Sequence, residues 1–85
     1  MGDGRYETEW ENLRIVIERR PEHWQAFVYD AENCEILYAA ERITADAAKV
    51  AALDFALVHR YGPSHDLEPG VVAEMLVWNS LRLLL

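Results

Sequence analysis

The chain has 85 residues, a formal net charge of -7, and apolar residues at 52% of its positions. This apolar content excludes an intrinsically disordered segment, and the length allows one small domain. Eight basic against fifteen acidic residues argue against nucleic acid as a partner, because phosphate backbones are bound through Lys and Arg. The composition therefore favours a small folded domain with an acidic surface.

The cysteine content and the two ends of the sequence bear on the compartment. The single Cys34 excludes an internal disulfide framework and a cysteine zinc site. The first ten residues lack the apolar stretch of a signal peptide, and the apolar run over 71–85 is shorter than the ~20 residues that cross a bilayer. We therefore expect a cytoplasmic protein with no membrane partner.

The first half of the chain alternates between apolar and polar residues, which predicts three extended segments. The first is one uninterrupted strand over 6–19, the second covers 23–29, and the third covers 35–41. Pro21 fits a tight turn after the first strand, and a turn rich in Asp and Asn follows the second. The short links predict an antiparallel three-stranded meander over 6–40.

Two helices are predicted after the strands. Thr44 is a favourable N-cap for a helix over 44–61, which a Gly-Pro pair ends. Residues 62–68 form a short linker, and a proline suits the first turn of a second helix over 69–84. The predicted fold is therefore a single two-layer α+β domain of β-β-β-α-α order over 1–85.

The first helix carries two apolar stripes. The stripe that we assign to the sheet, because small side chains permit close packing, consists of Ala47, Ala51, Phe55 and Val58. The other stripe consists of Val50, Leu53 and Leu57. The second helix can cover this other stripe.

The strand at 23–29 has large apolar residues on both faces, because Phe27 and Tyr29 alternate with apolar residues at 24, 26 and 28. The expected surface on the side away from the first helix contains Trp10, Val16, Phe27 and Tyr29, with either Tyr38 or Leu37 from the third strand. Contiguous exposed apolar patches are uncommon in monomers. Either the second helix or another molecule is therefore expected to cover this surface.

The second helix is apolar on nearly all sides, and a helix of this kind is normally buried on most of them. We therefore expect a protein–protein interaction module, with homodimerisation as the simplest use of the surplus apolar surface and another protein as the alternative partner. The predicted interface residues are Trp10, Val16, Phe27, Tyr29, Met75, Trp78 and Leu81.

Residues with catalytic or metal-binding chemistry do not form a recognisable site. His59 and His65 straddle a helix end and a Gly-Pro break, so their spacing sets no metal geometry. The acidic neighbours of Cys34 disfavour a thiolate, and the alternate glutamates of 7–11 are typical of a solvated face. We predict no enzymatic activity, no cofactor and no metal. An RNA-binding domain is a further alternative, based on the arginines within 14–20.

Four short features resemble the HicB antitoxin family. They are the Ile17-Glu18 pair, the aromatic-led strand "WQAFVYD", the Asn33-Cys34 turn, and the helix start "TADAA" at 44–48. The resemblance spans residues 13–60. It implies a β-β-β-α fold and an acidic protein that binds and inhibits a small basic RNase toxin.

Overall fold

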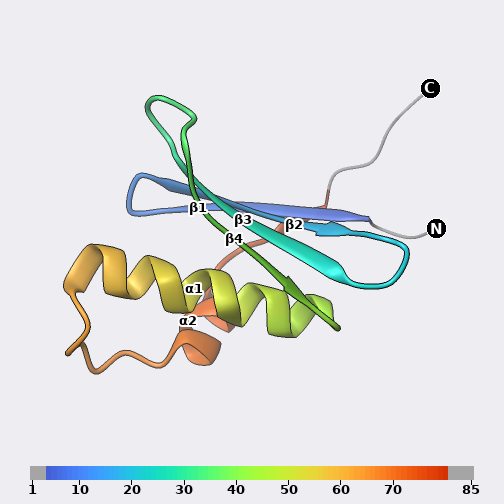
Figure 1. The fold of residues 1–85 in the computed structure, drawn as a ribbon. Coiled ribbons are helices and arrows are strands. Elements are labelled where there is room, and N and C mark those ends of the chain that lie inside the picture. Colours follow the sequence, from blue (N-terminus) through green and yellow to red (C-terminus); the bar gives the residue numbers. More distant parts are fainter. Residues whose placement is uncertain (1–3, 81–85) are drawn as a thin grey trace.

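The computed structural model describes residues 4–80 and arranges them as one antiparallel sheet with two helices (Figure 1). The elements are β1 (Arg5–Trp10), β2 (Leu13–Arg19), β3 (Trp24–Asp30), β4 (Ile36–Arg42), α1 (Ala45–Tyr61), α2 (Pro69–Met75) and β5 (Asn79–Ser80). The strand order is β4-β3-β2-β1-β5. The predicted α+β class and the two helices are confirmed, whereas the predicted three strands are an undercount.

The segment predicted as one strand over 6–19 is a hairpin, so that prediction is wrong. Glu11 and Asn12 have φ values of 50° and 65°, and Trp10 pairs with Leu13 directly across the turn. Positive φ at both residues of a two-residue loop is the signature of a type I′ turn, whose twist matches that of the flanking strands. The chain therefore reverses at this point, and β1 pairs with β2 along its whole length.

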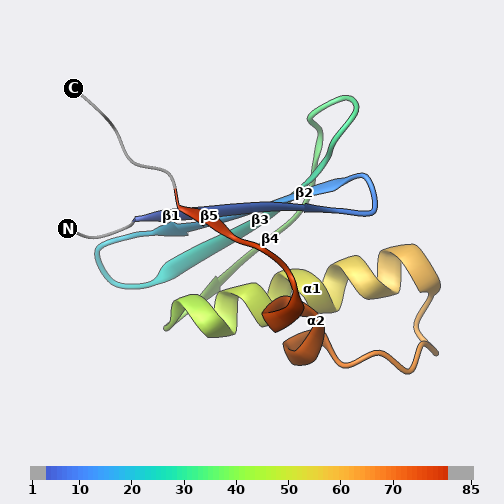
Figure 2. The same cartoon turned by 180° about the vertical axis from the view of Figure 1, so that it is seen from behind.

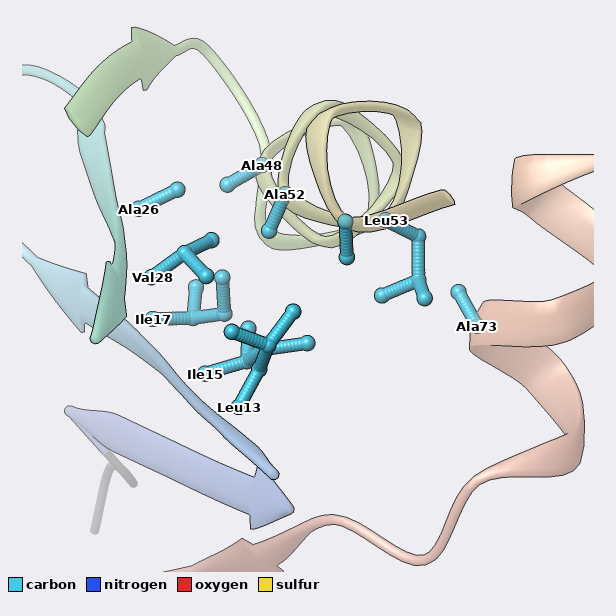
Figure 3. Close-up of a cluster of buried hydrophobic side chains, with 10 residues drawn as sticks. Leu13, Ile15, Ile17, Ala26, Val28, Ala48, Ala52, Leu53 and Ala73 are labelled. Atoms are coloured by element: carbon cyan, nitrogen blue, oxygen red, sulfur yellow. The ribbon is translucent and has the colours of Figure 1, made fainter. Parts of the chain in front are cut away.

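Both helices lie on one face of the sheet, and Figure 2 shows the same arrangement from behind. α1 packs against β2, β3 and β4, and α2 packs against α1. The buried cluster between the layers (Figure 3) consists of Leu13, Ile15, Ile17, Ala26, Val28, Ala48, Ala52, Leu53, Ala56 and Ala73. The opposite face of the sheet carries neither helix.

The ends of α1 are set by local hydrogen bonds, as the sequence predicts. The Thr44 hydroxyl accepts a hydrogen bond from the Ala47 amide at 3.1 Å, which satisfies one free amide of the first turn. Gly62 adopts a φ of 93°, and its N–H donates to the Val58 carbonyl at 2.8 Å.

The rotation of α1 about its axis differs from the predicted one by about one residue position. Ala48, Ala52 and Ala56 enter the core, whereas Val58 of the predicted stripe is 40% exposed. Phe55 does reach the sheet, where its ring stacks on Tyr38 of the edge strand β4 at 4.7 Å between centroids. The alanines permit the closest approach beneath the central strands, so the larger phenyl ring lies towards the sheet edge.

α2 ends at Met75, and the predicted continuation to residue 84 is wrong. The Trp78 indole N–H donates to the Ala73 carbonyl at 2.9 Å, which satisfies an acceptor at the end of this short helix. The buried Thr8 hydroxyl donates to the Val77 carbonyl at 2.8 Å. These two bonds fix an extended chain that crosses to β1.

β5 then closes the outer edge of β1. Asn79 pairs with Glu7 and Ser80 pairs with Tyr6. β4 forms the other edge of the sheet. Residues 81–84, which the prediction placed in the second helix, lie outside the described residues.

Replacing Asn12 tests the turn that separates β1 from β2. Asn12→Val places a β-branched side chain at a φ of 65° and is expected to lower the free energy of unfolding by about 1–2 kcal/mol. Asn12→Gly, which adopts this conformation without strain, is the matched control and is expected to stay within about 0.5 kcal/mol of wild type. Urea denaturation followed by circular dichroism measures both, and equal losses in the two variants would contradict the assignment of the turn.

Candidate functional site

The sheet surface away from the helices, here called the outer face, consists of three rows of side chains that run across the strands. Strand register defines them, because residues paired in an antiparallel sheet point to the same side. The middle row is Glu7, Val16, Phe27 and Ala39. The Arg5 row is Arg5, Glu18, Gln25 and Glu41. The Glu9 row is Glu9, Arg14, Tyr29 and Ile36.

An apolar patch occupies the part of the outer face over β2, β3 and β4, and consists of Val16, Phe27, Tyr29, Ile36 and Ala39. Val16 is completely buried although it lies on the face without helices. The Phe27 and Tyr29 rings lie beside each other at 6.0 Å between centroids, and both are half-buried. Ile36 is 55% exposed. The patch therefore has a packed centre and an exposed margin towards β4.

Ion pairs border the patch over β1 and β2. The Arg14 guanidinium donates to the Glu7 carboxylate, and this hydrogen bond raises the pKa of Arg14 above its usual value. Arg5 Nη1 lies 3.1 Å from Glu18 Oε2. Among the described residues, the exposed Glu9 forms no ion pair. The outer face is thus apolar on one side and charged on the other.

The structure places three of the predicted interface residues together on the outer face: Val16, Phe27 and Tyr29. Trp10, expected beside them, lies on the opposite face. It is paired with Leu13, and its ring meets Tyr61 of α1 edge-on at 6.0 Å. The turn after Trp10 causes this difference, because it breaks the alternation that would have placed Trp10 with Val16.

The contribution of β4 to the outer face also differs from the expectation, which named Tyr38 or Leu37. A register shift opposite Val28 and Tyr29 marks a β-bulge, so Leu37 is the extra residue and Ile36 pairs with Tyr29. Tyr38 faces α1 instead. No local signal in the sequence marks this bulge, and Ile36 was therefore missed. Ala39 pairs with Phe27 outside the bulge, and its small side chain gave no signal of a contact surface.

Two other predicted interface residues lie away from the outer face. Met75, at the end of α2, is 75% exposed, and Trp78 is half-buried in the segment that follows. Leu81 lies outside the described residues. The predicted set is therefore divided between two opposite sides of the molecule.

A cluster around Lys49, the only lysine of the chain, lies on the helical side. Its Nζ atom lies 4.7 Å from the ring centroid of Tyr6 and 5.1 Å from that of Trp78. A cavity of about 320 Å³ between α1 and α2 adjoins Lys49 and Trp78. Because Lys49 itself contacts both rings, the cluster joins β1, α1 and the segment before β5, and we assign it a structural role.

The residues considered for catalysis or metal binding lie in ordinary surroundings. The His59 ring stacks on Phe55 at 5.5 Å, and His65 Nδ1 accepts a hydrogen bond from the Leu67 amide at 3.0 Å. Cys34 is exposed. Within residues 4–80, no three His, Cys, Asp or Glu side chains gather in a metal-binding arrangement. No helix in the same range has the length and apolarity needed to cross a membrane.

Comparison with protein-family models, with curated proteins and with solved structures finds no significant match to this chain. The functional argument therefore depends on the geometry of the outer face and on the chemistry of its residues.

Replacing Lys49 tests the structural role of the aromatic cluster. Lys49→Met keeps the length of the side chain but removes the attraction of the ammonium for two rings. It is expected to lower the free energy of unfolding by about 1 kcal/mol. Lys49→Arg keeps the positive charge over the rings and is expected to lose less than half of that amount. Chemical denaturation measures both variants, and an arginine variant as unstable as the methionine variant would contradict the cation–π assignment.

Proposed function

We propose that this protein is a self-associating protein–protein interaction module and that the outer face is its contact surface. The observation that carries the proposal is the difference between the two faces of the sheet. Both helices lie on one face, and neither lies over the apolar patch on the other (Figures 1 and 2), where Ile36 and Ala39 are exposed and Phe27 and Tyr29 are half-buried. The proposal assigns no catalytic reaction to the chain.

The composition of the outer face supports this function. Protein interfaces commonly combine a well-packed centre that contains aromatic residues with a polar rim. Phe27 and Tyr29 are the aromatic residues of the patch, and Val16 beneath them is already excluded from water. The ion pairs of Arg5 and Arg14 supply the charged rim. The side chains stand on paired strands, which hold them in fixed positions.

A second copy of the chain is the partner that we propose. A domain of 85 residues buries a smaller share of its surface than a larger one, so covering an exposed patch with an identical patch adds core without a further element. A symmetric contact of one patch with itself is also the commonest form of oligomer interface. The outer face, which has both apolar and charged parts, suits this type of contact.

Replacing an aromatic residue of the patch tests the contact surface. Phe27→Thr removes the ring but keeps a residue that favours strands. We expect light scattering across a concentration series to show a dimer for wild type and a dissociation constant raised at least about tenfold for this variant. Val58→Thr, at an exposed apolar position on α1, is the matched control and should leave the dissociation constant unchanged.

Circular dichroism of both variants establishes that the fold is retained. A wild-type protein that stays monomeric at millimolar concentration would refute self-association. Equal weakening by Phe27→Thr and Val58→Thr would refute the outer face as the contact surface. Met75→Thr extends the comparison to α2, and loss of the dimer in that variant alone would place the contact on the helical side.

A further inference from the structure

The arrangement of charges on the outer face specifies how a second copy fits against it. This inference rests on the proposed function. We infer that two copies pack face to face about a two-fold axis that runs across the strands, along the middle row. Rotation by 180° about this axis keeps each strand over the same strand of the second copy, with its direction reversed. The two sheets are then aligned, which is one of the two common ways in which sheets pack.

The rotation exchanges the other two rows between the copies. The Arg5 row of one copy faces the Glu9 row of the second copy. Strand by strand, Arg5 lies over Glu9 of the second copy, because both belong to β1. Glu18 lies over Arg14 of the second copy, because both belong to β2. Symmetry repeats each contact, so four pairs of opposite charge form at the rim over β1 and β2. On β3 and β4 the same rotation places Gln25 over Tyr29 and Glu41 over Ile36 of the second copy.

These contacts give a partner to a carboxylate that forms no ion pair in the described part of the single chain. Glu9 is exposed and forms no ion pair among the described residues, and in the dimer it gains a guanidinium partner. Along the axis, Phe27 and the exposed Ala39 meet their own equivalents in the second copy, and Val16 stays buried beneath Phe27. Glu7 meets Glu7 of the second copy, but the guanidinium of Arg14 already neutralises each of these carboxylates within its own chain.

A second symmetric arrangement of the same two faces is disfavoured by charge. Its two-fold axis runs parallel to the strands along β2, the central strand of the sheet. Each residue of β2 then faces itself, so Arg14 meets Arg14 and Glu18 meets Glu18 of the second copy. Like charges placed opposite each other at an interface destabilise it. Between these two arrangements, the distribution of charge therefore favours the axis that runs across the strands.

The size of the outer face predicts a dimer of modest affinity. Four strands about 4.8 Å apart, with seven residues at about 3.3 Å each, cover roughly 450 Å² in each copy. The total of about 900 Å² lies below the ~1,200 Å² at which stable specific interfaces begin, in the range of weak and transient complexes. We therefore expect reversible association that dilution reverses.

Two complementary charge reversals test the docking geometry. Glu9→Arg alone places arginine against Arg5 of the second copy, and Arg5→Glu alone places glutamate against Glu9 of the second copy. Each variant alone is expected to have its dissociation constant raised at least about tenfold. In an equimolar mixture, the mixed dimer has opposite charges at every rim contact. Light scattering of the mixture should therefore show a dimer as stable as that of wild type. In a pull-down, an affinity tag on one variant should retain the other variant.

If mixing restores the dimer, the loss in each single variant comes from docking and not from misfolding, because a second chain does not repair damage inside the first. Glu74→Arg on α2 is the matched control, with the same charge change on the helical side, and should leave the wild-type dimer intact. If Phe27→Thr weakens the dimer but the mixture of the Glu9→Arg and Arg5→Glu variants stays dissociated, the docking geometry is overturned and the proposed function stands. A wild-type monomer at every concentration overturns both.

A cross-link provides a second test that needs no change of charge. Ala39 is exposed and lies on the middle row, so the two copies bring it close to its own equivalent. With Cys34→Ser as background, Ala39→Cys should form a dimer with a bis-maleimide about 10 Å long, the separation of packed sheets. An axis along β2 would place Ala39 over β5 of the second copy instead. Absence of the cross-link in a sample that is dimeric by light scattering overturns the proposed axis.

Discussion

The left-handed turn at Glu11 and Asn12 is the constraint on which the outer face depends. It pairs Trp10 with Leu13 and so determines which residues of β1 point towards the helices. Tyr6 and Thr8 consequently lie on the helical side, where they meet Lys49 and the segment before β5. The charged residues at 5, 7 and 9 lie on the other side. A shift of one residue in this turn would reverse both sets.

The sequence predicted those elements of the fold whose limits are set by neighbouring residues. Thr44 and Gly62 bound α1 by hydrogen bonds within the same helix, and both were recognised. The hairpin was missed because Glu-Asn lacks the glycine that usually marks such a turn. The end of α2 was missed because it depends on hydrogen bonds from distant residues. Thr8, which binds the Val77 carbonyl, is 69 residues away in the chain.

The candidate site likewise combines residues that a local pattern predicts with residues that depend on distant parts of the chain. Phe27 and Tyr29 were found because alternation within one strand is a local property. Their neighbour Ile36 was not, because a bulge in β4 moved it to the outer face in place of Leu37. The opposite charges at the rim depend on the register of β1 against β2. This register can be predicted only once the position of the turn at Glu11 and Asn12 is known.

The junction between β1 and β5 has a consequence for the order of folding. The turns that join β1 through β4 each close after a few residues, whereas the bond from Thr8 to Val77 closes a loop of 69 residues. Closing so long a loop costs roughly 2 kcal/mol more in chain entropy than closing a five-residue one. The hairpins are therefore favoured to form first, with the backbone of β1 open along one side. Before β5 pairs with β1, the unpaired edge of β1 could pair with a strand of another chain. The pairing of β5 removes this exposed edge.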